Sequence, residues 1–184
     1  LLDQNAGWAL NEGSMFFEEK GAVHESLRRI VQKLEELGIP YAVAGGMALF
    51  AHGYRRFTED VDILVTRDGL NRIHDELDGR GYLRPFEKSK NLRDTESKVK
   101  IEFLVTGEYP GDGKPKEIAF PDPSSVSEIR KGYRVLNLPH LISLKLASGL
   151  TGDGRTKDLA DVEELIKLLQ LPESLVESLH PYVQ

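Results

Sequence analysis

Two aspartates separated by a single residue, Asp60 and Asp62, begin an apolar segment that ends at Val65. Along an extended strand, side chains two positions apart point to the same face, so both carboxylates project together and Val61 points away from them. Neighbouring carboxylates repel each other, and a charge that begins an apolar strand needs a partner. Mg²⁺ binds oxygen ligands, often one or two carboxylates together with substrate phosphates. We therefore predict a divalent-metal site here rather than a solvated strand edge.

Two adjacent glycines, Gly45 and Gly46, lie thirteen residues before this acidic pair, at the end of a short apolar run. Glycine lets the backbone approach another group closely, and a helix that begins just after such a turn directs its free N–H groups at an anion. The glycines could merely link a strand to a helix, but that turn would still form a phosphate site. A phosphate-binding turn beside a metal-binding pair is the arrangement that phosphoryl transfer needs.

The glycine pair followed by Asp-x-Asp resembles the signature of the nucleotidyltransferase superfamily, which adds a third carboxylate from a later strand. Glu102, inside the apolar run of residues 98–106, is the candidate for that position, where the family usually has aspartate. The resemblance implies that Asp60, Asp62 and Glu102 bind Mg²⁺ or Mn²⁺, and that Glu102 accepts the proton of an attacking hydroxyl. From the residues alone, Glu102 could instead face outward and pair with one of the lysines two and four positions before it.

The C-terminal third extends the resemblance, which covers roughly residues 40–170. Lys145 is followed by Arg-x-Lys-Asp-x-x-Asp, from Arg155 through Asp158 to Asp161. This pattern resembles the AbiEii-like branch, which includes toxin nucleotidyltransferases of toxin–antitoxin systems. The resemblance implies that Lys145 binds the triphosphate and that Asp158 positions Lys145 or the nucleotide, with Asp161 a weaker candidate. The alternatives are a lysine that reaches water from an apolar helix and acidic residues that a helix N-terminus favours in any case.

Basic residues appear in two further places. Arg55 and Arg56 precede the acidic pair, and the arginine fork suits phosphate, so we assign Arg56 to the nucleotide site together with the glycine pair. The alternative for both arginines is an exposed loop. Residues 84–100 contain six basic and three acidic residues, which indicates either an RNA-binding surface or a solvated loop.

Composition limits the class of protein. The chain has 184 residues, of which 40% are hydrophobic and 29% charged, as in an ordinary globular protein with one core. Its net charge of −6 does not attract nucleic acid to the molecule as a whole. It contains no cysteine, which excludes disulfides and thiolate metal sites and fits a cytoplasmic location. We expect neither a signal peptide nor a membrane span, since no apolar run approaches about 20 residues.

Periodicity predicts an α+β fold, a small mixed sheet with packed helices, and the resemblance implies that this is the polymerase-β-like nucleotidyltransferase fold. The predicted strands are residues 41–44, 61–66, 98–106 and 133–138, with a further strand start near 126–129. The predicted helices are residues 23–37, 46–52, 68–79, 139–148, 156–170 and 172–179, with a loop at 107–123 and a turn at 149–154. We divide the chain into an arm or cloning-derived segment (1–20), a nucleotidyltransferase core (21–138) and a helical C-terminal subdomain (139–184).

The resemblance implies transfer of a nucleoside monophosphate from an NTP to an acceptor hydroxyl. Acceptors in order of preference are an RNA or tRNA end, a protein and a small molecule, and a cognate antitoxin is a possible partner. Three alternatives stay open: a catalytically inactive nucleotide-binding module, an antitoxin or interaction module, and a metal-dependent phosphohydrolase or nuclease.

Overall fold

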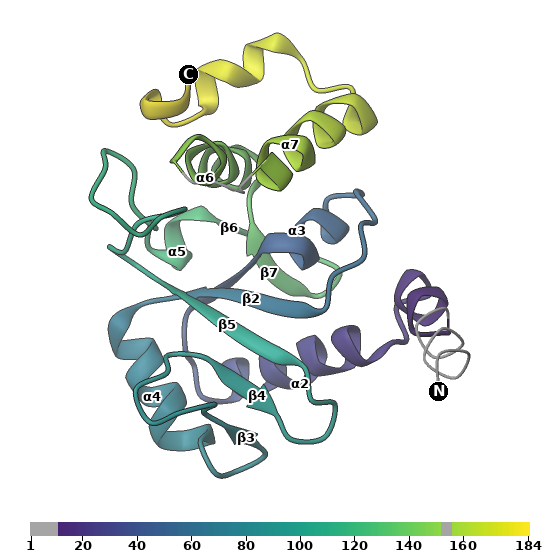
Figure 1. The fold of residues 1–184 in the computed structure, drawn as a ribbon, viewed down its shortest axis with the longest axis vertical. Helices are drawn as coiled ribbons and strands as arrows, with labels where there is room; N and C mark the ends of the chain where they lie inside the picture. The colour runs from purple at the N-terminus through teal and green to yellow at the C-terminus, as the bar shows by residue number, and fades with distance from the viewer. Residues whose placement is uncertain (1–10, 152–155) are drawn as a thin grey trace.

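The structure, a computed structural model, describes residues 11–151 and 156–184. In this part of the chain a seven-stranded mixed sheet has the order β3-β4-β5-β2-β1-β7-β6 (Figure 1). The strands are β1 (Tyr41–Ala44), β2 (Asp60–Val65), β3 (Tyr82–Leu83), β4 (Leu92–Asp94), β5 (Lys100–Val105), β6 (Ser127–Arg130) and β7 (Tyr133–Leu136). The α-helices are α2 (Ala22–Glu36), α3 (Gly45–Ala51), α4 (Arg67–Leu77), α5 (Pro123–Val126), α6 (Leu138–Thr151) and α7 (Thr156–Leu169), and two 3₁₀ helices follow, η1 (Glu173–Ser178) and η2 (Pro181–Val183).

β2 lies in the middle of the sheet and holds the acidic pair. It is antiparallel to β1 and parallel to β5, and the register places Asp62 opposite Glu102 and Asp60 opposite Lys100. Residues directly opposite each other on neighbouring strands share a face. The pairing therefore brings the third predicted carboxylate to the same face as the first two.

The other face of β2 and β5 is apolar, and α2 and α4 cover it. One buried cluster there combines residues of β2 and β5 with residues of the two helices: Val61, Ile63, Ile101, Phe103, Leu27, Ile30, Leu34, Leu70, Ile73 and Leu77. Alternation along both strands thus assigns the apolar side chains to this core and the charged side chains to the opposite face. Because a slip of one residue would bury the charges, the core also fixes the register.

α6 and α7 pack against the charged face, beside the carboxylates rather than over them. Figure 1 shows them at one end of the molecule with the C-terminal segment, while α4, β3 and β4 lie at the other end. A second buried cluster joins the helices to the small side chains of β1: Ala42, Ala44, Leu64, Leu141, Ile142, Leu144, Val162 and Leu165. α6 therefore belongs to the same packed unit as the sheet, and the division proposed at residue 138 stays a prediction.

The predicted elements are confirmed for the longer strands and helices, with ends that differ by a few residues. The sequence did not reveal β3 and β4, which are two and three residues long, too short for a period of two to be visible. It also missed η2, and the predicted last helix is the 3₁₀ helix η1.

The predicted turn at Gly149 is wrong, because α6 continues to Thr151. An added Cβ on Gly149 would lie 2.5 Å from Cδ2 of Leu159 and 3.3 Å from its backbone nitrogen. This glycine therefore allows α7 to pack closely on α6, and it does not end the helix. Residues 152–154 of the predicted turn lie outside the described residues.

The segment 1–20, left aside in the sequence analysis, contributes to the core where it is described. Residues 11–17 are helical, and Phe16 is 1% exposed. Its ring packs edge-on against Phe50, with centroids 5.2 Å apart. Among the described residues, no helix has the length and apolar character needed to cross a membrane.

Replacement of Gly149 by alanine tests the packing of α6 on α7. We expect Gly149→Ala to lower the free energy of unfolding by about 1–3 kcal/mol, because the methyl group overlaps Leu159. Gly13→Ala is the control, since nothing lies within 4 Å of its added Cβ, and it should be neutral or slightly stabilising. Urea unfolding of both variants measures the difference, and equal stabilities would contradict the account of Gly149.

Candidate active site

The glycine turn and the acidic strand touch each other. Gly45 has a φ of +56°, and an added Cβ would lie 1.9 Å from Oδ2 of Asp62. A Cβ on Gly46 would lie 2.8 Å from Cβ of Thr58. Only glycine at position 45 satisfies both the left-handed backbone and the carboxylate packed against it. The turn thus allows β2 to lie close to the start of α3.

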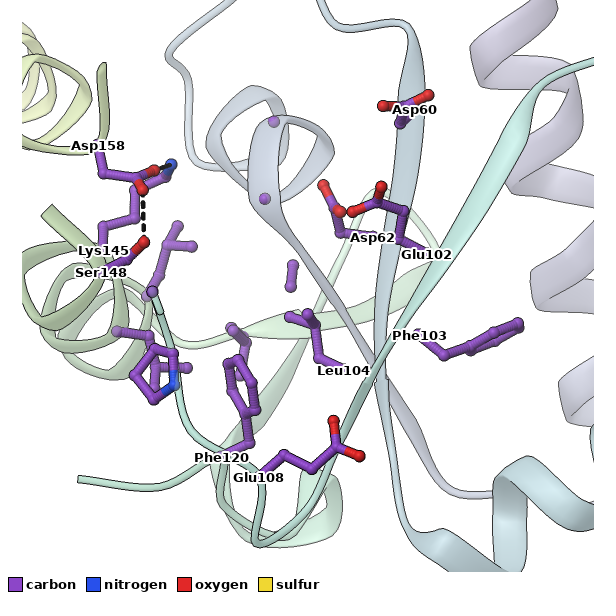
Figure 2. Close-up of a pocket in the computed structure, with 18 of the residues that line it drawn as sticks. Asp60, Asp62, Glu102, Phe103, Leu104, Glu108, Phe120, Lys145, Ser148 and Asp158 are labelled. Carbon is purple, nitrogen blue, oxygen red and sulfur yellow. Dashed lines mark hydrogen bonds and ion pairs between the residues drawn. The ribbon is translucent and has the colours of Figure 1, made fainter. Parts of the chain in front are cut away.

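The three predicted carboxylates lie on one face of the sheet. Figure 2 shows the carboxylates of Asp62 and Glu102 directed at each other, with Asp60 farther along β2. All three side chains are partly exposed. The cleft that they line has a volume of about 1030 Å³, enough to hold a nucleotide and part of an acceptor.

Their electrostatic environment favours an added cation. Burial, followed by the charges of Glu102 and Asp60, raises the pKa of Asp62 to about 7. Burial and then the charge of Glu102 also raise the pKa of Asp60. Each carboxyl therefore resists ionisation, first because it is buried and then because its neighbours are negative, and a bound divalent cation would offset both effects.

A lysine partly compensates this charge. Lys100 forms an ion pair with Glu102, and the hydrogen bond to Glu102 is the main reason why the pKa of Lys100 is raised. Glu102 thus combines the two roles that the sequence left as alternatives: it faces the cleft, and it pairs with a lysine of its own strand. Lys98 instead donates to the backbone oxygen of Thr95.

The residues fit a magnesium ion that is completed by a substrate. Among the described residues, no three His, Cys, Asp or Glu side chains are arranged to hold a metal by themselves. The facing carboxylates of Asp62 and Glu102 supply the one or two carboxylates that Mg²⁺ commonly takes from a protein, with phosphate oxygens and water as its other ligands. The raised pKa of Asp62 is the observation that supports this fit.

The predicted phosphate-binding lysine is buried and paired. Lys145 is 8% exposed, and its Nζ lies 3.0 Å from Oδ1 of Asp158 and 2.8 Å from Oδ2 of Asp161. Ser148 Oγ donates to Asp158 Oδ2 at 2.6 Å, as Figure 2 shows for the three labelled residues of this group. The charge of Lys145 opposes the rise in the pKa of Asp62 without cancelling it. The ammonium group is therefore within electrostatic reach of the acidic pair.

Arg56 belongs to the same network. Its Nε lies 2.9 Å from Oδ1 of Asp161, and its Nη2 donates to Oδ2 at 3.1 Å. Asp161, which is 2% exposed, thus contacts both Arg56 and Lys145. The sequence analysis gave Asp161 as a weaker candidate and did not name Ser148; the spacing of three residues between the two aspartates was the available signal that both lie on one helix face. Arg155 of the same pattern lies outside the described residues.

The cleft contains every residue predicted for the site. Its lining includes Gly45, Gly46, Arg56, Asp60, Asp62, Glu102, Lys145 and Asp158. The predicted loop after β5 supplies another wall through Tyr109 and Pro110, and Phe120 adds an aromatic ring. Sequence reasoning assigned no role to this wall, because none of its residues carries a recognisable motif.

Comparison with solved structures shows a nucleotidyltransferase fold. The crystal structure of ANT(2'')-Ia in complex with adenylyl-2''-tobramycin is similar to this chain with a TM-score of 0.58 and 13% identity, over 84% of this chain and 92% of that one. The solution structure of ANT(2'')-Ia gives a TM-score of 0.50 at 14% identity, over 82% and 85%. A nucleotidyltransferase-like protein from Paracoccidioides brasiliensis gives 0.48 at 19% identity, over 81% of each chain. No protein-family model matches the sequence, and no curated protein matches it.

Asp62→Asn tests the origin of the raised pKa. The folded pKa of about 7 exceeds the ordinary value of 3.8, so the folded protein binds a proton more tightly than the unfolded chain and loses stability as pH rises from 4 to 7. Because asparagine is neutral, the metal-free variant should be more stable than the wild type by up to about 4 kcal/mol at pH 8 and similar at pH 4. Urea unfolding in EDTA at both values measures this.

Asp75→Asn, on the exposed side of α4, is the control for removal of a carboxylate away from the cleft. It should change stability equally little at both pH values. Loss of stability in Asp62→Asn at pH 8 would mark the carboxylate as a structural anchor and contradict the like-charge account.

Proposed function

We propose that the protein is a metal-dependent nucleotidyltransferase that moves a nucleoside monophosphate from an NTP to an acceptor hydroxyl. The observation that carries the proposal is the Asp62–Glu102 pair, held against Gly45 in the cleft of a nucleotidyltransferase fold. The raised pKa of Asp62, its position opposite Glu102 and the adjacent glycine turn support a cation-binding role for this corner of the sheet. The use of an NTP fits the cytoplasmic location expected from the absence of cysteine.

Asp60, Asp62 and Glu102 would hold Mg²⁺ or Mn²⁺. When bound, such a cation supplies Lewis acidity at the phosphate oxygens and stabilises the attacking and leaving oxygens. The carboxylates themselves fix where the triphosphate lies, and Asp62 does so against the start of α3. Positioning and charge stabilisation are the main contributions that a protein makes to this reaction.

The remaining residues handle the triphosphate and the proton. The acceptor oxygen forms a bond to the α-phosphorus, the bond to the β-phosphate oxygen breaks, and pyrophosphate leaves. Glu102 accepts the hydroxyl proton, for which it must lie within hydrogen-bond reach. Lys145 and Arg56 contact the triphosphate, and Asp158 keeps Lys145 directed into the cleft. Gly45 and Gly46 let the phosphates approach the backbone.

The acceptor is an RNA or tRNA end, a protein hydroxyl or a small molecule. ANT(2'')-Ia, which shares the fold, was crystallised with an adenylylated aminoglycoside, and this supports a small-molecule hydroxyl as the second choice. A place in a toxin–antitoxin pair, with a cognate antitoxin as partner, follows from the resemblance to the AbiEii-like branch alone.

A nucleotide-binding or interaction module without catalysis is the second candidate function. The paired state of the cations supports it, because Arg56 and Lys145 are both neutralised by aspartates. A triphosphate must replace these partners before the cations can stabilise charge on its oxygens. A protein that binds a nucleotide without displacing them would not transfer it.

Label transfer separates the candidates. The wild type is incubated with each α-labelled NTP, Mg²⁺ and, in turn, an RNA mixture, a lysate and a panel of hydroxylated small molecules. We expect a labelled adduct, and at least about a 100-fold lower rate for Asp60→Asn and Asp62→Asn, because each loses a metal ligand. Asp75→Asn, remote from the cleft, should react like the wild type. Asp60→Asn should also fold normally, since it relieves like-charge repulsion.

Three other results would contradict the proposal in different ways. NTP binding without any adduct supports the module. Release of nucleotide fragments or RNA breakdown without an adduct supports a phosphohydrolase or nuclease. Undiminished transfer by Asp62→Asn places the chemistry elsewhere in the protein.

A further inference from the structure

The face of the sheet that carries the carboxylates continues beyond β5 to the sheet edge. Across the strands, Asp60 is paired with Lys100, Lys100 with Arg93, and Arg93 with Leu83. Paired residues share a face, so Leu83, Arg93 and Lys100, here called the edge strip, extend from the acidic site toward solvent. Arg93 is exposed, and Leu83 is 53% exposed.

The edge strip is positively charged next to a negative site. Lys100 and Arg93 both lie near enough to Asp60 to oppose the rise of its pKa. Lys88, in the connection from β3 to β4, and Lys98, in the connection from β4 to β5, are exposed. Among the ion pairs of the described residues, none includes Arg93, Lys88 or Lys98. These cations are therefore available to an anion that reaches the cleft from this side.

The local charge contrasts with that of the whole molecule. Residues 84–100 have six basic and three acidic side chains in a chain of net charge −6. Arg84, Lys90 and Lys100 are paired with Asp78, Glu108 and Glu102, so the positive charge that remains for a polyanion comes from Lys88, Arg93 and Lys98. The charge pattern thus selects both the kind of ligand and its direction of approach.

An exposed aromatic ring favours nucleic acid over an acidic peptide. Phe86, in the connection from β3 to β4, is 65% exposed. Bases of single strands stack on such rings, while nearby arginine and lysine contact the phosphates. Neighbouring strands are about 4.8 Å apart, so Lys100 and Arg93 lie roughly 5 and 10 Å from β2 along the sheet. Phosphates close to a strand end would reach both residues while the terminal hydroxyl lies at Asp60.

We propose that the edge strip binds the phosphate backbone of a single-stranded RNA end whose terminal hydroxyl is the acceptor. This inference rests on the proposed function for the transfer step, in which the terminal hydroxyl oxygen bonds to the α-phosphorus, its proton passes to Glu102 and pyrophosphate leaves. RNA binding itself requires only the strip and the exposed ring. It is therefore measurable without any NTP.

The test measures binding of a fluorescein-labelled single-stranded RNA of about 12 nucleotides by anisotropy, without NTP. Wild type should bind with an affinity that falls as salt rises. Arg93→Gln should bind at least about fivefold more weakly, and its slope of log affinity against log salt should decrease in magnitude by about 0.7, the value for one lost phosphate contact on a single strand. The double variant Arg93→Gln/Lys98→Gln should lose more.

Lys33→Gln is the matched control. It removes one exposed lysine of α2, on the helix that covers the opposite face of the sheet, and should bind the RNA like the wild type. Thermal unfolding of each variant, which should stay within a few degrees of the wild type, shows that they are folded. If wild type does not bind the RNA, or if Arg93→Gln binds as tightly as Lys33→Gln, the inference is overturned.

Binding of labelled NTP with Mg²⁺, measured on the same variants, separates this inference from the proposed function. Arg93→Gln should bind NTP like the wild type, because Arg93 lies outside the nucleotide site. Failure of all variants to bind NTP would overturn the proposed function while RNA binding still tests the edge strip. A parallel loss of NTP and RNA binding in Arg93→Gln would overturn the separate role of the strip.

Discussion

Repulsion between two facing carboxylates is the constraint around which this structure is organised. Asp62 and Glu102 cannot move apart, because the parallel pairing of β2 and β5 fixes them opposite each other and the apolar side chains on the far face fix that pairing. Gly45 also packs against Asp62, so closely that any side chain at position 45 would overlap the carboxylate. The apolar core thus holds together a cluster of like charges that Lys100 and Lys145 only partly compensate. A fold that holds such a cluster is prepared for a cation.

Three cations of the cleft are each paired with a carboxylate. Lys100 balances Glu102, while Lys145 and Arg56 are balanced by aspartates of α7. These pairs hold the buried Lys145 and the partly exposed Arg56 and Lys100 beside acidic partners in the free protein, and an unpaired charge at Lys145 would be costly. In the proposed reaction a metal–triphosphate complex would offer each group a new partner: the carboxylates would exchange a lysine for a metal, and the cations would exchange aspartate for phosphate. Substrate binding would then be an exchange of ion pairs rather than the burial of new charge.

Local patterns in the sequence were sufficient for the strands and for the acidic pair. The period of two places Asp60 and Asp62 on one face without any knowledge of the fold, and the apolar run around Glu102 predicts its strand. What the sequence could not reveal depends on distance. Arg56 and Asp161 are 105 residues apart and become partners only when the fold brings α7 next to the connection from α3 to β2. From the sequence, Gly149 predicts a turn. The structure shows that a side chain at this position would overlap Leu159 of the neighbouring helix.

Titration of the proposed metal site tests the central claim most directly. Mn²⁺ bound to the protein is followed by electron paramagnetic resonance, with a non-hydrolysable NTP analogue present. We predict one or two bound ions in the wild type, a loss of affinity of at least about tenfold in Asp62→Asn and in Glu102→Gln, and unchanged binding in Asp75→Asn. Binding of Mn²⁺ by both carboxylate variants with the affinity of the wild type would show that the facing pair is not a metal site and would contradict the account.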